Sequence, residues 1–217
     1  MMDSRDACGW QCGALRSAAR GSLPSAGDEA PVVIRFGGSL LGRSDWPQRA
    51  AATLELPFPG GSASGARTLV VGGGSVVEGL RDIARIRPVD LSLVHRLAID
   101  GMGITARLVA ATLGLPLVSR PGGRHAVLDM AAWLADAPER AATIPSSWSV
   151  TSDSLAAVVA AAGGAALLLV KSVPPPAHEA SLGPVGFAPL AAQGWVDGWF
   201  PTAAAAVTRI GWAAPAP

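Results

Sequence analysis

Two glycine clusters each follow an apolar stretch of the chain directly. The glycines and the serines after them are Gly37, Gly38 and Ser39 in the first cluster and Gly72, Gly73, Gly74 and Ser75 in the second. Glycines between a strand and a helix expose backbone N–H groups at the helix N-terminus, where phosphate oxygens bind. Two such clusters in one domain predict a ligand with several phosphates, or two phosphorylated ligands that meet.

The two clusters differ in what they indicate. Gly-Gly-Ser is common in plain turns, so the first cluster alone favours a turn in which Ser39 caps the next helix or donates to a phosphate. Three consecutive glycines lose backbone entropy that a plain turn has no need to lose, so the second cluster favours contact with a phosphate or substrate.

Two cationic residues could act on such a ligand. Arg35 lies in the apolar stretch before the first cluster, and Lys171 ends a later apolar stretch. Phosphoryl transfer needs cations where negative charge develops. Lys171 is the only lysine of the chain; it either contacts a nucleotide phosphate or is a solvated strand end. Thr151, Ser152 or Asp153 could equally be a helix N-cap.

Apolar stretches alternate with helix-like segments beyond about residue 31. We expect strands at 31–36, 69–71, 115–119 and 166–170, helices at 46–54, 76–84, 89–113 and 154–162, and a possible last strand at 210–213. This order predicts an α/β fold, a three-layer α/β/α sandwich with a mostly parallel central sheet. Ligands bind at the carboxyl ends of the strands in such folds, and both glycine clusters fall there.

Composition limits the remaining choices. The chain has 217 residues, 50% of them apolar, and a net charge of +1, so we expect one compact domain over 31–213 with a tail at 214–217, and no nucleic-acid partner. The longest apolar run is too short for a membrane span. Residues 1–30 lack the apolar core of a secretory signal peptide, so we expect them to form a flexible leader. The only two cysteines, Cys8 and Cys12, lie in this leader, and we expect them to be incidental thiols of a reduced, cytoplasmic protein.

These segments together resemble the amino acid kinase superfamily, which transfers the γ-phosphoryl group of ATP to a carboxylate, phosphate or phosphonate. The resemblance implies ATP and Mg²⁺, and no metal-ligand residues are assigned. It implies that Asp153 orients the cations at the transferring group, with Arg35 at a position where the family has lysine. The expected catalytic residues are Arg35, Asp153 and Lys171. The residues expected to bind phosphate or nucleotide are Gly37, Gly38, Ser39, Thr151, Ser152, Lys171 and Ser172.

Three further stretches, 90–102, 148–154 and 194–201, are similar to the small branch of this superfamily that contains the kinase of methanofuran biosynthesis. The resemblance implies (5-aminomethyl-3-furyl)methyl phosphate as the acceptor, with Gly72, Gly73, Gly74 and His95 in the substrate site and a homo-oligomeric assembly. His95 alone would more often be a helix-surface histidine.

Two departures from the family pattern keep a second function open. Arginine stands at position 35, and the stretch after Val173 is rich in proline, without the lysine-bearing nucleotide loop of related kinases. The alternatives are therefore an active small-molecule kinase and a catalytically lapsed relative that acts as a binding or assembly subunit.

Overall fold

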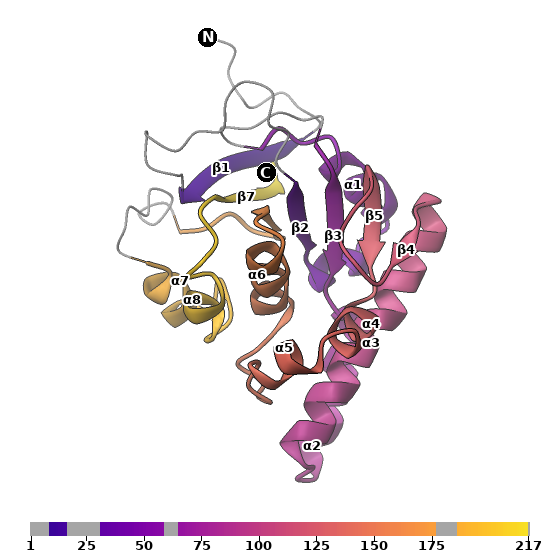
Figure 1. Cartoon of the computed structure of the whole chain (residues 1–217), viewed down its shortest axis with the longest axis vertical. Helices are drawn as coiled ribbons and strands as arrows, with labels where there is room; N and C mark the ends of the chain where they lie inside the picture. Colours follow the sequence, from indigo (N-terminus) through magenta and orange to yellow (C-terminus); the bar gives the residue numbers. More distant parts are fainter. Residues whose placement is uncertain (1–8, 17–30, 59–64, 177–185, 217) are drawn as a thin grey trace.

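The computed structural model describes residues 9–16, 31–58, 65–176 and 186–216. Seven strands form one sheet in the order β1-β7-β6-β2-β3-β5-β4, and only the β1–β7 pair is antiparallel. The strands are β1 (Trp10–Arg16), β2 (Val32–Phe36), β3 (Arg67–Val71), β4 (Leu117–Val118), β5 (His125–Leu128), β6 (Ala166–Val170) and β7 (Ile210–Pro215). The predicted α/β fold with a mostly parallel sheet is confirmed (Figure 1).

Helices lie on both faces of this sheet. They are α1 (Trp46–Thr53), α2 (Gly74–Ile86), α3 (Leu91–Leu113), α4 (Met130–Ala135), α5 (Pro138–Ala142), α6 (Ser152–Ala162), α7 (Ala188–Ala192) and α8 (Phe200–Ala203), with a 3₁₀ helix, η1 (Gly38–Gly42). Each helix that the sequence predicts at 46–54, 76–84, 89–113 and 154–162 is present, with ends that differ by two residues or fewer.

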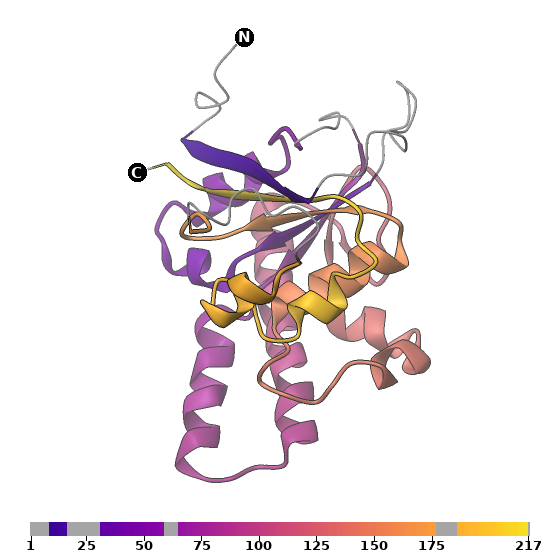
Figure 2. The same cartoon turned by 90° about the vertical axis from the view of Figure 1, so that its left-hand side faces the viewer.

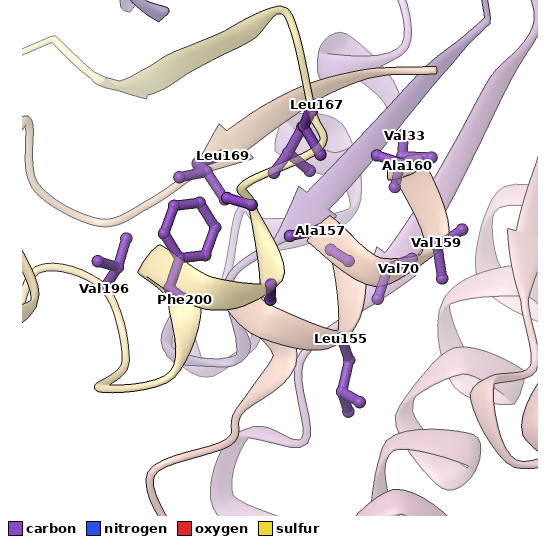
Figure 3. Close-up of a cluster of buried hydrophobic side chains, with 14 of the residues drawn as sticks. Val33, Val70, Leu155, Ala157, Val159, Ala160, Leu167, Leu169, Val196 and Phe200 are labelled. Carbon is purple, nitrogen blue, oxygen red and sulfur yellow. The ribbon is translucent and has the colours of Figure 1, made fainter. Parts of the chain in front are cut away.

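The alternation of side chains along the strands divides the core into two clusters. Val33, Val70 and Leu167 pack under α6 and α8 on one face (Figure 3). Their neighbours Ile34 and Leu168 point to the other face, where α1 and α3 cover them. Because successive side chains of a strand point to opposite faces, a central strand that is apolar throughout must be buried on both.

The prediction of a flexible leader over residues 1–30 is wrong for the part of it that the structure describes, residues 9–16. Trp10–Arg16 forms β1, an edge strand paired with β7, and Trp10 and Leu15 are each only 2% exposed. Gly13 fits because a Cβ there would collide with the indole of Trp212 in β7. The segment gains its strand conformation from this distant partner. Cys12 lies within β1 as a free thiol whose pKa burial raises, whereas Cys8 lies outside the described residues.

The structure also differs from the sequence analysis at the other edge of the sheet. The expected strand at 115–119 shortens to β4, and the unpredicted β5 is the strand that pairs with β3. At the far end, β7 confirms the expected last strand but continues to Pro215, past the predicted domain boundary. Within the described ranges, no helix has the length and apolar character needed to cross a membrane.

Two antiparallel helices project from the body of the molecule. Figure 2 shows α2 running away from the sheet and α3 returning to it, with the turn at residues 87–90 farthest from the core. Helix α2 has no fully buried residue. The bases of both helices lie beside the glycine clusters, where the candidate site forms.

Candidate functional site at the carboxyl edge of the sheet

The candidate site lies where three neighbouring strands end. β2 is flanked by β3 and β6, and their loops are joined by backbone hydrogen bonds: Gly37 N–H donates to Val170 O at 3.0 Å and Gly72 N–H to Phe36 O at 2.9 Å. The strands that follow β2 in the sequence, β3 to β5, lie on one side of it in the sheet. The next strands, β6 and β7, lie on its other side. Ligand crevices form at such a switch point.

The two glycine clusters touch each other here. A Cβ on Gly72 would lie 2.6 Å from the backbone nitrogen of Gly38, and one on Gly38 would collide with the backbone of Gly74. Gly74 also adopts the left-handed φ of 53°. These glycines are therefore required for the close approach of two loops, a reason that the sequence analysis did not foresee. Gly73 is the N-cap residue of α2 and has no side chain to accept a hydrogen bond. The backbone N–H groups of the first turn of α2 therefore have no side-chain acceptor from the cap.

Arg35, Asp153 and Lys171 form one cluster. Asp153 Oδ2 accepts a hydrogen bond from Lys171 Nζ at 2.7 Å, and Asp153 Oδ1 lies 2.7 Å from Arg35 Nε. The Arg35 Nε–H bond points instead to Ser152 Oγ, at 3.2 Å, so Oδ1 is buried in an ionic contact without a hydrogen-bond donor. The carboxylate is 4% exposed and both cations are under 15% exposed. One buried anion thus holds two cations together.

Lys171 is held on several sides. Its Nζ also donates to the carbonyl oxygen of Trp195 and lies 4.9 Å from the centre of the Trp195 ring. Burial lowers the pKa of Lys171 below its ordinary value; the charge of Asp153 opposes this shift, and the charge of Arg35 adds to it. The surroundings therefore fix the position of the ammonium group while weakening its hold on the proton.

Thr151 and Asp153 have different roles at the start of α6. Thr151 is the N-cap residue, and its hydroxyl accepts from Asp153 N–H at 3.4 Å. Asp153 is one residue further into the helix, where its side chain turns to the two cations. The capping that the sequence analysis left open among three residues falls to Thr151, so the Asp153 carboxylate is free to pair with Arg35 and Lys171.

Sequence reasoning missed Asp197, which organises this helix start. Its carboxylate accepts from Thr151 N–H at 2.9 Å, Thr151 Oγ at 2.8 Å and Ser154 N–H at 3.0 Å. It also accepts from the hydroxyl of Ser154 and from the first N–H groups of the α8 segment. An acidic residue before glycine in an apolar stretch was the available signal. Asp197 thereby joins the Asp153 helix to the Trp195 segment.

Two cavities open on either side of this cluster, and both are lined by Arg35 and Ser39. The first has a volume of about 450 Å³ and contains Gly38, the second glycine cluster, His95, Thr151 and Ser152. The second has a volume of about 410 Å³ and contains Lys171, Ser172 and Trp195. All expected site residues except Gly37 and Asp153 line one cavity or the other, and those two lie beside Arg35, which lines both. We call these the glycine cavity and the lysine cavity.

The far end of the glycine cavity holds polar residues that the sequence did not single out. Arg81 of α2 lies with its guanidinium 4.8 Å from the centre of the Trp148 ring, and its Nε is buried without an acceptor. Glu78, one turn earlier, lies 3.5 Å from Arg81. His95 of α3 is half-buried beside them, and burial lowers its pKa below the ordinary value of 6.5. For Glu78 and Arg81, the Glu-x-x-Arg spacing on a helix was the only sequence signal, whereas His95 was expected in the substrate site.

The residues present fit a phosphorylated ligand better than a metal ion bound by protein alone. Two cations, uncapped helix N–H groups and close-packed glycines meet at the junction of the cavities. Within the part of the chain that the structure describes, no cluster of three metal-ligating side chains occurs. Any Mg²⁺ here would therefore be held mainly by ligand phosphates. The proline-rich stretch after Val173 continues into residues 177–185, which lie outside the described ranges.

Comparison with known proteins gives matches only among solved structures. No family model and no curated protein matches the chain. A uridylate kinase from Archaeoglobus fulgidus matches with 16% identity and a TM-score of 0.44, over 65% of this chain and 63% of that kinase. A UMP kinase from Ureaplasma parvum matches with 13% identity and a TM-score of 0.45, over 67% and 68%. The similarity is one of fold, and the methanofuran branch stays a prediction.

Proposed function

We propose that this protein transfers the γ-phosphoryl group of ATP to a small oxyanionic acceptor. The observation that carries this proposal is that two cavities share Arg35 and Ser39, and that the Asp153 carboxylate pairs with both Arg35 and Lys171. Transfer between two bound molecules needs two adjoining sites with cations at their junction, because negative charge collects there. The arrangement supports an acceptor site and a nucleotide site side by side.

The lysine cavity suits the nucleotide. Lys171 and Ser172 supply an ammonium group and a hydroxyl beside Ser39, whose Oγ lies 3.5 Å from that of Ser172. Bound ATP·Mg²⁺ would supply the phosphoryl group to be transferred. Lys171 and Arg35 would neutralise the negative charge on the phosphoryl oxygens. Asp153, which pairs with both cations, would hold them at a fixed separation. The orientation of all three depends on the start of α6, which Asp197 fixes.

The glycine cavity suits the acceptor. The N-terminal turn of α2 and Arg35 would bind its phosphate or carboxylate near the junction. Beyond them the wall is apolar, with Ile99, Met102 and Leu155, and it ends at Trp148 and Glu78. A furan ring would lie along the apolar wall, and an aminomethyl group would reach the Glu78 carboxylate. This supports (5-aminomethyl-3-furyl)methyl phosphate as the first acceptor to test, in the series expected from the sequence.

A titration calorimeter tests the proposal with ATP·Mg²⁺ and the full chain. We expect binding, and we expect bound ATP to protect the amine of Lys171 from acetylation. The single lysine makes this readout unambiguous, since the N-terminal amine is the only other amine. Transfer is then followed with labelled ATP and furanmethyl phosphate, carboxylate and nucleoside monophosphate acceptors. No ATP binding, or acetylation of Lys171 at an unchanged rate in saturating ATP, would contradict the proposed site.

One observation favours the second candidate, a lapsed kinase that binds without catalysis. The guanidinium of Arg35 already donates two hydrogen bonds within the protein. Its Nε donates to Ser152 Oγ, and its Nη1 donates to the carbonyl oxygen of Val170 at 3.4 Å. An arginine that is committed to the protein in this way has less freedom to follow a transferring group than a lysine would have. Binding of ATP and protection of Lys171 without transfer to any acceptor would favour this candidate.

A further inference from the structure

Two contacts close the far end of the glycine cavity. Arg81 of α2 stacks on the ring of Trp148, with the central guanidinium carbon 4.8 Å from the ring centre. His95 of α3 meets the same segment one residue earlier: burial lowers the pKa of His95, and a hydrogen bond with the backbone of Ser147 opposes that shift. Arg81, His95 and Trp148 all line the cavity. The two projecting helices and the segment before α6 are therefore joined across its end.

Helix geometry gives the distance from the glycine cluster to this closed end. Gly74 begins α2, and Arg81 lies seven residues later, about 10 Å along the helix axis. On α3, Met102 lies beside Gly73, where a Cβ would be 3.7 Å from Met102 Cγ, and His95 lies seven residues before Met102. Both helices therefore place their closing residue about 10 Å from the glycines.

The wall between the two ends is apolar on both helices, with Val77 on α2 and with Ala98 and Ile99 on α3. The closed end is polar. Arg81 Nε is buried and has no hydrogen-bond acceptor among the described residues, while Nη1 of the same guanidinium lies 3.5 Å from Glu78. A buried donor without an acceptor is costly, and a ligand that supplies the acceptor removes this cost. The closed end therefore suits a polar group and disfavours an alkyl group.

We infer that Arg81 and Trp148 determine which acceptors the glycine cavity takes. They end the cavity about 10 Å from the glycine cluster, and they select short acceptors that carry a polar group at the end remote from the reacting oxyanion. This inference rests on the proposed role of the glycine cavity as the acceptor site. Both residues lie far from the transferring group, so they determine specificity and take no part in the chemical step.

Titration calorimetry of the full chain with n-alkyl phosphates, from ethyl to octyl, tests the position of the closed end. Each methylene buried along an apolar wall raises affinity about fourfold. We expect the affinity of the wild type to rise in this way until the alkyl chain spans about 10 Å, and then to stop rising. In Arg81→Ala the contact with Trp148 is lost, so the rise should continue to the octyl compound.

Arg85→Ala is the matched control, because it removes the same charge one turn later on α2. Arg85 is 66% exposed and pairs with Asp82, so this variant should keep the limit of the wild type. Trp148→Leu removes the other half of the stacking contact and should extend the limit as Arg81→Ala does. Alanine favours the helical conformation, so Arg81→Ala should keep the circular dichroism spectrum of the wild type.

A second comparison tests the polarity of the closed end. The alkyl phosphate of limiting length is compared with its analogue that carries a terminal hydroxyl group. We expect the hydroxyl compound to bind the wild type several-fold more tightly, because its oxygen accepts from Arg81 Nε–H. Arg81→Met has a side chain of similar length without a donor, and it should lose this preference. Equal preference in Arg81→Met and the wild type would overturn the role of Arg81 in selecting a polar group.

The outcomes separate this inference from the proposed function. Affinity that rises through the whole series in the wild type, or a limit that neither Arg81→Ala nor Trp148→Leu moves, overturns the inference and leaves the acceptor site in place. Failure of every alkyl phosphate to bind contradicts the acceptor site itself, and the inference falls with it.

Discussion

Gly72 lies directly against the backbone of Gly38, so that a Cβ at Gly72 would be 2.6 Å from Gly38 N and 3.0 Å from Ser152 Oγ. The loops after β2 and β3 can approach so closely only without side chains. We expect Gly72→Ala to lower the free energy of unfolding by about 2 kcal/mol, as overpacking does. Urea denaturation measures this loss.

Gly79 supplies the matched control for this substitution. It lies on the exposed side of α2 with open space around it, so Gly79→Ala should raise stability by about 1 kcal/mol through helix propensity. If both variants behave alike, the contact between the two loops is not what requires glycine at position 72.

Asp153→Asn should destabilise the protein and change Lys171. Removing the anion leaves two buried cations facing each other, which costs about 3 kcal/mol. Because the charge of Asp153 raises the pKa of Lys171, that pKa should fall further in the variant. With ¹⁵N-labelled lysine the protein gives a single side-chain signal, whose titration reports the shift. Asp45→Asn, in an exposed ion pair, should leave this signal unchanged.

Arg35→Ala should lower phosphoryl transfer by about a hundredfold or more, since a cation at the junction of the cavities is lost. Arg35→Lys should keep part of the activity, because the charge remains while the contacts to Ser152 and Val170 change. Arg43→Ala, which removes an exposed arginine at the end of η1, serves as control. Transfer at the wild-type rate by Arg35→Ala would refute the role of this cation.

Removal of residues 1–16 should lower the melting temperature by more than the few degrees that loss of an unattached tail would cause. Trp10 alone is 2% exposed, and replacing a buried tryptophan with alanine costs about 3–5 kcal/mol. Trp10→Ala and the deletion should therefore act in the same direction in differential scanning calorimetry. Removal of residues 1–8 is the control and should leave β1 paired with β7.

Acid should destabilise the wild type partly through His95. Burial lowers its pKa in the folded protein, while the unfolded chain binds a proton near pH 6.5. The unfolded state therefore holds more protons below that pH, and stability falls as pH decreases from 7 toward 5. His95→Gln should make this fall shallower in urea titrations at several pH values. A slope that does not change would show that His95 is not neutral and buried in the folded state.

The sequence predicted the central strands and long helices because their signals are local. Apolar runs that end in glycine mark β2 and β3, and periodic apolar residues mark α3. β1 could not be predicted, because Trp10–Arg16 has no strand-like alternation and depends on β7, about 200 residues away.

The candidate site shows the same limit. Arg35 and Lys171 were singled out by charge and position, and Asp153 by the family resemblance, but the ion pairs among them depend on three elements coming together. Asp197 and the Arg81–Trp148 contact link segments distant in sequence, and the local signals for Asp197 and Arg81 are too common to reveal these contacts.

The pairing of β1 with β7 also orders events during synthesis. β1 leaves the ribosome early, and its partner strand Ile210–Pro215 leaves almost 200 residues later. Contacts between such distant segments form late, because the loop they close costs the most entropy. The β1 segment, with Trp10, must therefore remain unpaired until Ile210–Pro215 has been synthesised.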